Sequence, residues 1–181
     1  MRIRDASAAD WPGIWAVLEP VIRAGDTYTV DADTPEEALR DWWLHGADPD
    51  DGGTRRRAPR TFVVTEETGG EAPPMVVATA ELHANYGGAA GRTANAGFMV
   101  HPDHVGKGYA RALAHHVLDQ AAAAGFTDMV FNAVVESNTA AVALWESLGF
   151  RIVGTVPAVF DHPVDGLVGL HVMHRSLAGR V

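Results

Sequence analysis

The sequence predicts a single mixed α/β domain over residues 1–181. A chain of 181 residues has the length of one domain and can bury a sizeable core. Three strand-like runs in its middle are separated by turns rich in glycine and proline, which favours an antiparallel meander. Helix-like and strand-like segments then alternate, so we expect the meander to lead into the order strand, helix, strand, helix, strand.

The N-terminal part of the chain predicts one short strand and two helices. Arg2–Asp5 is a short alternating stretch, as expected of a strand. A helix begins at Asp10-Trp11-Pro12 and ends at Gly25, with apolar side chains at helical spacing: Ile14, Val17, Leu18, Val21 and Ile22. Thr34–His45 predicts a second helix with proline at its first position. Residues 48–60 are polar and rich in helix breakers, which predicts a loop.

The meander is expected over three runs: Thr61–Glu66, Met75–Asn85 and Thr93–Val100. A helix follows the glycine-rich stretch at residues 106–108 and stops at Gly125. Its apolar positions are Ala110, Leu113, Ala114, Val117, Leu118 and Ala121.

The C-terminal part predicts three more strands and one helix. Met129–Val135 is strand-like, and the next helix is capped by Ser137 or Asn138 and ends at Gly149. The closing strands are expected at Phe150–Val156 and Val168–His174. The segment between them, Val156–Leu167, could close over a binding pocket together with the polar loop described above.

The composition excludes several classes of function. The net charge of −9 argues against a nucleic-acid partner, which needs a basic surface. The chain has no cysteine, so disulfides, thiolate catalysis and cysteine-bound metal are excluded. No apolar run approaches the roughly 20 residues that span a bilayer, and the N-terminus lacks an apolar signal segment. We expect a cytoplasmic protein with no membrane partner, and thirteen arginines against one lysine suggest a GC-rich bacterial genome.

The only lysine, Lys107, lies between two glycines at the start of a predicted helix. Glycines there let several backbone N–H groups point in one direction, and with the positive helix end these groups form an anion site. Lys107 and Arg111 add positive charge, so a phosphate or pyrophosphate fits best. The stretch is not a P-loop, because Gly-Lys-Ser/Thr is missing, and it lacks the third glycine of a dinucleotide-binding motif. The alternative is a plain structural turn.

Four stretches follow one another in the order Val100–Pro102, Gly106–Ala110, Ser137–Ala141 and Leu144–Phe150. Together they resemble the GCN5-related N-acetyltransferase (GNAT) superfamily, whose members transfer an acetyl group from acetyl-coenzyme A to amines. The motifs cover residues 97–150. The expected order of elements fits the fold of the superfamily, which has a splayed central pair of strands, over nearly the whole chain.

The resemblance implies which residues hold acetyl-coenzyme A. The backbone of one stretch would bind the pyrophosphate: Gly106, Lys107, Gly108, Tyr109, Ala110 and Arg111. On the splayed strand, Phe98, Met99 and Val100 would bond the pantetheine arm, and one of their N–H groups would polarise the thioester oxygen. Asn138 would meet the pantetheine region.

Two residues depart from the pattern of the superfamily. Val105 stands where arginine or glutamine is frequent, so Lys107 and Arg111 must supply the positive charge. Trp145 stands where a tyrosine commonly protonates the leaving thiolate, and an indole N–H cannot act as that acid. Either water protonates the thiolate, or it leaves unprotonated, which a thiol pKa near ~8.5 tolerates. Trp145 itself either walls the thioester pocket or is a core aromatic residue.

Two asparagines point to the acceptor. The stretches Ala94–Val100 and Phe131–Asn138 resemble the fungal N-acetyltransferases that act on azetidine-2-carboxylate and proline-like imino acids. The resemblance implies that Asn95 and Asn132 take part in substrate binding and catalysis. Two neutral amides on neighbouring strands can hold a carboxylate and a ring nitrogen. The alternative is that both only satisfy backbone groups where the strands splay.

Other segments offer further acceptor-site candidates. Asp26 could bind a substrate ammonium and Tyr28 could stack on the substrate, or both belong to a loop that only ends the first helix. A general base must take a proton from the attacking amine. Glu81, which shares a strand face with His83, is favoured over Glu136, which ends a later strand.

The predicted function is acetyl-coenzyme A-dependent acetylation of a small-molecule amine, such as an amino or imino acid, by direct attack. The nine histidines include no His-Glu-x-x-His motif, so no metal site is expected. One alternative is acetylation of a protein or peptide N-terminus, which needs an open groove. Another is a coenzyme A-binding regulatory module without catalysis. A homodimer is compatible with the resemblance, because members of the superfamily often dimerise.

Overall fold

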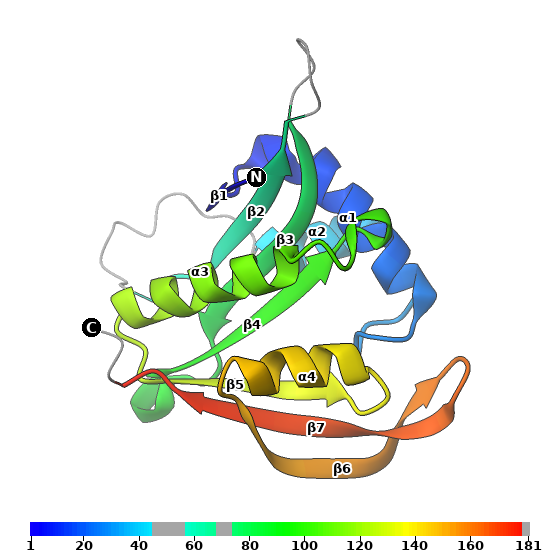
Figure 1. Cartoon of the computed structure of the whole chain (residues 1–181), viewed down its shortest axis with the longest axis vertical. Coiled ribbons are helices and arrows are strands. Elements are labelled where there is room, and N and C mark those ends of the chain that lie inside the picture. Colours follow the sequence, from blue (N-terminus) through cyan, green and yellow to red (C-terminus); the bar gives the residue numbers. More distant parts are fainter. Residues whose placement is uncertain (45–56, 68–73, 179–181) are drawn as a thin grey trace.

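The computed structural model describes residues 1–44, 57–67 and 74–178 (Figure 1). In this part of the chain, seven strands form one sheet: β1 Arg2–Asp5, β2 Arg60–Glu66, β3 Met75–Ala84, β4 Thr93–Val100, β5 Asp128–Val135, β6 Arg151–His162 and β7 Gly166–Ser176. The α-helices are α1 Trp11–Ala24, α2 Glu36–Leu44, α3 Tyr109–Ala123 and α4 Thr139–Ser147. Most of the loop predicted at residues 48–60 lies outside the described residues.

The sheet has the order β1-β2-β3-β4-β5-β7-β6. Strands β2, β3 and β4 pair in antiparallel fashion with their sequence neighbours, which confirms the predicted meander. Strands β4 and β5 run parallel, and α3 connects them as the alternation predicts. The predicted mixed α/β fold is therefore confirmed.

Strands β4 and β5 separate shortly after they meet. Their parallel pairing covers only Thr93 with Asp128 and Ala94 with Met129. From Asn95 onward the edge of β4 is no longer covered by β5, and Figure 1 shows the two strands diverging. This confirms the splayed central pair.

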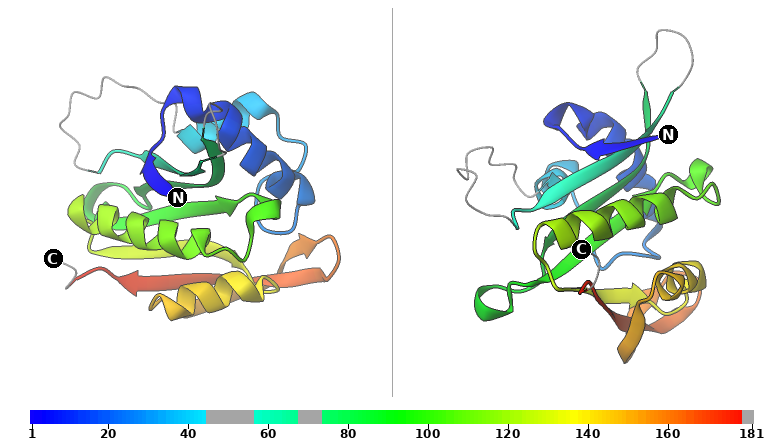
Figure 2. Two further views of the ribbon diagram at one scale, coloured as in Figure 1. Left: turned by 45° about the horizontal axis from the view of Figure 1, so that its top comes forward. Right: turned by 60° about the vertical axis from the view of Figure 1, so that its left-hand side comes forward.

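The helices cover the two faces of the sheet, as the views in Figure 2 show. Helices α1 and α2 build one core, whose buried members include Ile14, Val17, Leu18, Leu39, Trp43, Val63 and Met99. Helices α3 and α4 build the other core, which includes Leu113, Val117, Leu118, Trp145, Phe62, Ala80 and Phe131. Because successive strand residues point to opposite faces, the central strands supply side chains to both cores and are fixed from both sides.

The C-terminal hairpin is longer than the sequence predicts. Strand β6 continues to His162 and β7 begins at Gly166, so Val156–Leu167 belongs mostly to the hairpin. None of these described residues lines the cavity of the next section, and the expectation that this segment closes over a pocket is wrong. The sequence predicts that this strand ends at Val156, before Pro157. In the structure β6 continues beyond the proline, with a register shift between Val156 and Phe160. An edge strand tolerates proline, because its outer N–H groups have no ladder partner.

Candidate active site

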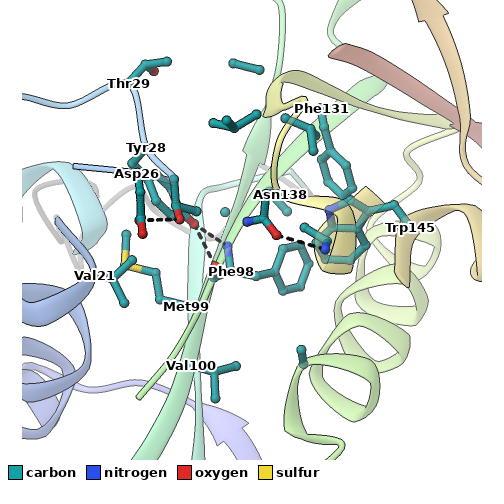
Figure 3. Close-up of a pocket in the computed structure, with 18 of the residues that line it drawn as sticks. Val21, Asp26, Tyr28, Thr29, Phe98, Met99, Val100, Phe131, Asn138 and Trp145 are labelled. Atoms are coloured by element: carbon teal, nitrogen blue, oxygen red, sulfur yellow. Dashed lines mark hydrogen bonds between the residues drawn. The ribbon is translucent and has the colours of Figure 1, made fainter. Parts of the chain in front are cut away.

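A cavity of about 890 Å³ opens where β4 and β5 separate (Figure 3). Its walls come from the segment between α1 and α2, from β3, β4 and β5, and from the start of α4. Many predicted site residues lie in these walls: Asp26, Tyr28, Glu81, Asn95, Phe98, Met99, Val100, Ala110, Asn132, Asn138 and Trp145. The fold therefore brings the predicted β4 and acceptor residues to one place. Of the six residues predicted to bind the pyrophosphate, Ala110 is among the described residues that line the cavity, whereas Gly106, Lys107, Gly108, Tyr109 and Arg111 are not.

The N-terminal end of α3, residues Gly106–Arg111, forms what we call the α3 mouth. Gly106 and Gly108 have φ angles of 76° and 83°, which residues with side chains rarely adopt. Beside both Cα atoms the space is open: apart from chain neighbours, no described atom lies within 4 Å of where a side chain would begin. The first N–H groups of a helix have no intrahelical partner. The α3 mouth therefore presents bare amides to open space, which fits a diphosphate.

The side chains at the α3 mouth differ in direction. Lys107 Nζ lies 3.3 Å from His104 Nδ1, at the exposed surface. Tyr109 is buried, and its hydroxyl donates to the Glu66 carboxylate, which raises the pKa of Tyr109. Tyr109 can therefore serve a bound anion only through its backbone, whereas Lys107 can reach it with its charge.

Alternate residues of β4 differ in what their backbones can bind. The His101 N–H bonds the Val77 carbonyl of β3 at 2.9 Å. In an antiparallel ladder the polar groups of alternate residues point the same way, so those of Met99 face β3 as well. The polar groups of Phe98 and Val100 consequently point away from β3, into the splay. Among the three predicted β4 residues, these two can bond a pantetheine arm.

The Phe98 peptide already has a partner in this structure. The Tyr28 hydroxyl accepts from Phe98 N–H and donates to the Phe98 carbonyl, at 2.8 Å each (Figure 3). The ring of Tyr28 meets the edges of Trp42 and Trp43, with centroid distances of 6.0 and 6.3 Å. Burial raises the pKa of Tyr28 far above its usual value, so the hydroxyl keeps its proton.

Glu81 is buried on β3 and faces the cavity beside this peptide. Its Oε2 lies 2.6 Å from His83 Nδ1, two residues along the strand. A Cβ at Gly97 would lie 3.0 Å from Glu81 Oε1 and 3.2 Å from the Trp43 ring. The absence of a side chain at Gly97 therefore lets the carboxylate sit directly over β4, next to Phe98.

Glu136, the other predicted base, has a different role. Its Oε2 accepts from the Gly169 N–H at 2.9 Å and so ties the end of β5 to β7. Glu136 is not among the described residues that line the cavity. The geometry therefore favours Glu81 over Glu136 as the group that meets an acceptor.

The two predicted asparagines have different hydrogen-bond partners. Asn95 Oδ1 accepts from the neighbouring Ala96 N–H at 2.8 Å. Asn132 exchanges two hydrogen bonds with Asn85, at 2.6 and 3.1 Å. Both predicted residues line the cavity, so their amides border the space that an acceptor would use.

Asp26, Asn138 and Trp145 complete the walls. Asp26 Oδ1 accepts from the Thr27 hydroxyl at 2.8 Å. Asn138 caps α4 by accepting from the Ala141 N–H at 3.1 Å. Trp145 packs 4.9 Å from Phe98 and 4.8 Å from Phe131, measured between ring centroids, so it is a core aromatic residue that also walls the cavity.

Sequence reasoning missed three residues that line or support the cavity. His83 is placed on the same strand face as Glu81 by the sequence analysis, but it is given no role there. The spacing of two residues was the signal that the two side chains can contact each other. Asn85 continues the same spacing, and that alternation was the signal for it. Trp42 comes from α2, and no pattern in the sequence indicates that it lines the cavity.

The described residues also bear on metal binding and on membrane spanning. No group of three histidine, aspartate or glutamate side chains lies close enough to hold a metal ion in this part of the chain. Within residues 1–44, 57–67 and 74–178, no helix is long and apolar enough to cross a membrane.

A bare helix N-terminus fits a phosphate-bearing ligand, and the carboxylate and amides at the nearby splay fit a group-transfer reaction. The chain belongs to the acetyltransferase (GNAT) family, whose model matches residues 21–150. It is therefore an acyltransferase, and acetyl-coenzyme A is its co-substrate.

Two named relatives match parts of the chain. The L-methionine sulfoximine/L-methionine sulfone acetyltransferase of Pseudomonas aeruginosa is 32% identical over 165 residues, which is 87% of this chain and 84% of that protein. N-acetyltransferase aca1 of Schizosaccharomyces pombe is 40% identical over 72 residues, which is 40% of this chain and only 34% of the fungal protein.

Solved structures match nearly the whole chain. A GCN5-related N-acetyltransferase from Kribbella flavida has a TM-score of 0.84 and 40% identity, covering 97% of this chain and 96% of that one. The structure of yncA from Salmonella typhimurium, which contains its cofactor acetyl-CoA, has a TM-score of 0.78 and 25% identity, covering 98% and 94% of the two chains.

Proposed function

We propose that this enzyme transfers acetyl from acetyl-coenzyme A to the amine of a small molecule, and that an amino or imino acid is the acceptor. One observation carries the proposal: the β4 residues that can hold the donor arm and the side chains suited to an amine line the same cavity. Reaction by direct attack follows, because the chain has no cysteine that could carry the acetyl group.

The roles of the chain's own groups follow from their positions. Amides of the α3 mouth bind the diphosphate, and Lys107 adds positive charge there. Phe98 N–H donates to the acetyl oxygen, where negative charge develops during attack. Glu81 takes the proton from the amine nitrogen as the new N–C bond forms and the C–S bond breaks, and coenzyme A leaves as its thiolate. Acetyl-coenzyme A supplies the acetyl group in an activated form, as a thioester.

The polar groups of the acceptor end suit a small zwitterion. Asp26 and Glu81 offer negative charge for an ammonium group, while the amides of Asn95 and Asn132 can donate to a carboxylate. Among the lining residues in the described part of the chain there is no lysine or arginine, so the carboxylate would be held by donors such as these neutral amides rather than by a guanidinium or ammonium group. The Pseudomonas relative, named for two methionine derivatives, supports an amino-acid acceptor.

The two alternatives have less support. A peptide N-terminus needs an extended groove, whereas the relative from Pseudomonas aeruginosa is named for small amino-acid derivatives. A regulatory module without catalysis would be favoured by Trp145 at the usual position of the tyrosine acid. The buried Glu81 beside the Phe98 peptide argues for catalysis instead.

A thiol-release assay with an acceptor panel tests the proposal. The panel contains proline, azetidine-2-carboxylate, methionine sulfoximine, methionine sulfone, simple amines and short peptides. We expect release with one or more amino or imino acids. Release with peptides alone would support the N-terminal alternative, and tight binding of acetyl-coenzyme A without release from any acceptor would support the regulatory one.

We also propose that two copies of the chain associate through β6. This strand is a sheet edge of 12 residues, and its side chains are exposed except near Phe160 and His162. Residues 152–160 carry no charge, and Val153, Val156 and Val159 are exposed.

The other edge of the sheet, β1, has only 4 residues and is charged. Short, charged edge strands are one way in which natural sheets avoid pairing with another chain. Two chains of net charge −9 repel elsewhere, so an uncharged edge is where they can meet.

Light scattering tests this association. We expect a molar mass of twice 19.3 kDa for the natural chain and a shift toward the monomer in Val156→Lys. Val164→Lys, in the hairpin turn beyond the strand, is the matched control and should keep the dimer. A natural chain that stays monomeric at high concentration contradicts the proposal.

A further inference from the structure

The Tyr28 hydroxyl satisfies a peptide group that a sheet would normally satisfy. Beyond Ala94, β4 has no neighbour on its β5 side, and the polar groups of Phe98 point that way. Buried N–H and C=O groups need partners. The single hydroxyl of Tyr28 provides both, as acceptor and donor at 2.8 Å each, and so replaces a missing strand.

The hydroxyl is held in place rather than loosely docked. The Tyr28 ring is packed against the edges of Trp42 and Trp43. Trp43 is in turn fixed by its indole N–H, which donates to the Thr79 hydroxyl at 3.0 Å. Burial raises the pKa of Tyr28, so the phenol stays protonated well above neutral pH and keeps its bond to the Phe98 carbonyl.

The proposed function gives the same N–H a second partner, the oxygen of the acetyl thioester. A backbone N–H makes one good hydrogen bond at a time, so the two oxygens exclude each other. Coenzyme A has the same pantetheine arm but lacks the acetyl oxygen, so only the thioester makes this demand on the Phe98 N–H.

We propose that Tyr28 competes with the acetyl thioester for the Phe98 N–H, and that it thereby sets the preference of the enzyme between acetyl-coenzyme A and coenzyme A. The inference rests on the proposed function, because it needs the donor arm to lie along β4. Binding of the thioester then turns Tyr28 away from Phe98. Since Tyr28 also lines the acceptor end, donor binding and acceptor binding are coupled through this residue.

The test is a pair of titrations, with acetyl-coenzyme A and with coenzyme A, on the natural chain and on Tyr28→Phe. The substitution keeps the ring against both tryptophans and removes only the hydroxyl. We expect the affinity for acetyl-coenzyme A to rise about three- to tenfold, because the substitution removes one hydrogen bond that competes with the thioester. The affinity for coenzyme A should stay unchanged. Tyr86→Phe, an exposed tyrosine outside the cavity lining, is the matched control and should change neither affinity.

Tryptophan fluorescence gives a second readout that needs no turnover. In the natural chain we expect acetyl-coenzyme A to change the emission of Trp42 and Trp43 more than coenzyme A does, and Tyr28→Phe should reduce that difference. An unchanged affinity ratio in a folded Tyr28→Phe chain overturns the inference but leaves the proposed function intact. A fall in kcat without a change in the ratio also overturns it, since Tyr28 would then act on the leaving thiolate. A natural chain that binds neither ligand overturns both.

Discussion

At the α3 mouth, backbone amides around two glycines face open space, whereas at the reacting end of the cavity side chains from separate segments meet at Gly97 and Phe98 of β4. The first end is built from one continuous stretch, Gly106–Arg111. The second is assembled from Tyr28, Glu81 and Trp43, which come from three separate elements. Donor binding therefore depends on local backbone shape, whereas reaction and acceptor choice depend on packing between segments that are distant in the sequence.

The largest effect is expected at the reacting end, from Glu81→Gln. The amide keeps the size of the side chain but cannot take a proton, so kcat should fall about 100- to 1,000-fold. Affinity for acetyl-coenzyme A should remain within about twofold, because the α3 mouth is untouched. Steady-state kinetics and a direct titration measure the two quantities.

Glu136→Gln is the matched control for this change, since glutamine can still accept from Gly169 N–H. Its kcat should remain near that of the natural enzyme. If Glu136→Gln loses activity and Glu81→Gln does not, the base has been assigned to the wrong strand.

At the α3 mouth, Gly108→Asp should weaken binding of both coenzyme A and acetyl-coenzyme A by about 100-fold. The carboxylate would stand near the diphosphate, and repulsion between charges a few ångströms apart costs a few kcal/mol. Calorimetric titration measures the loss. Gly88→Asp is the control, because Gly88 also has a positive φ, 57°, and open space beside it. Intact binding by Gly108→Asp would remove the diphosphate from this place.

A smaller effect is expected on the acceptor side, from Asn132→Ala. Loss of one or two hydrogen bonds should raise KM for the acceptor about tenfold, with acetyl-coenzyme A affinity unchanged. If the amide pair acts as a unit, Asn85→Ala should have a similar effect, and the double variant should be little worse than either. The reverse pattern, with donor affinity lost and acceptor use kept, would move Asn132 out of the acceptor site.

The smallest effect tests how tightly the reacting end is packed. Gly97→Ala places a methyl group 3.0 Å from Glu81 Oε1 and 3.2 Å from Trp43, so both must shift. We expect kcat to fall a few-fold and stability to drop by about 1 kcal/mol, measured by kinetics and thermal unfolding. Gly87→Ala, which has open space, should change neither. An unaltered kcat in Gly97→Ala would mean that the position of Glu81 is not critical.

The same contrast explains what the sequence could predict. Glycines at a helix start restrict the backbone directly, so the shape of the α3 mouth follows from Gly106 and Gly108 alone. The order of the elements also follows from the sequence, because periodicity is local, whereas the splay was expected only from the resemblance to the superfamily. The bond between Tyr28 and Phe98 joins residues 70 apart, and the pair of Asn85 and Asn132 joins residues 47 apart. Such contacts depend on packing that no local pattern encodes.

A structure of the chain with bound acetyl-coenzyme A tests the central claim most directly. We expect the diphosphate oxygens within hydrogen-bonding distance of backbone N–H groups of Gly106–Arg111, and the thioester oxygen on Phe98 N–H with Tyr28 turned away. A diphosphate bound elsewhere, or a thioester that leaves the bond between Tyr28 and Phe98 intact, would contradict the account.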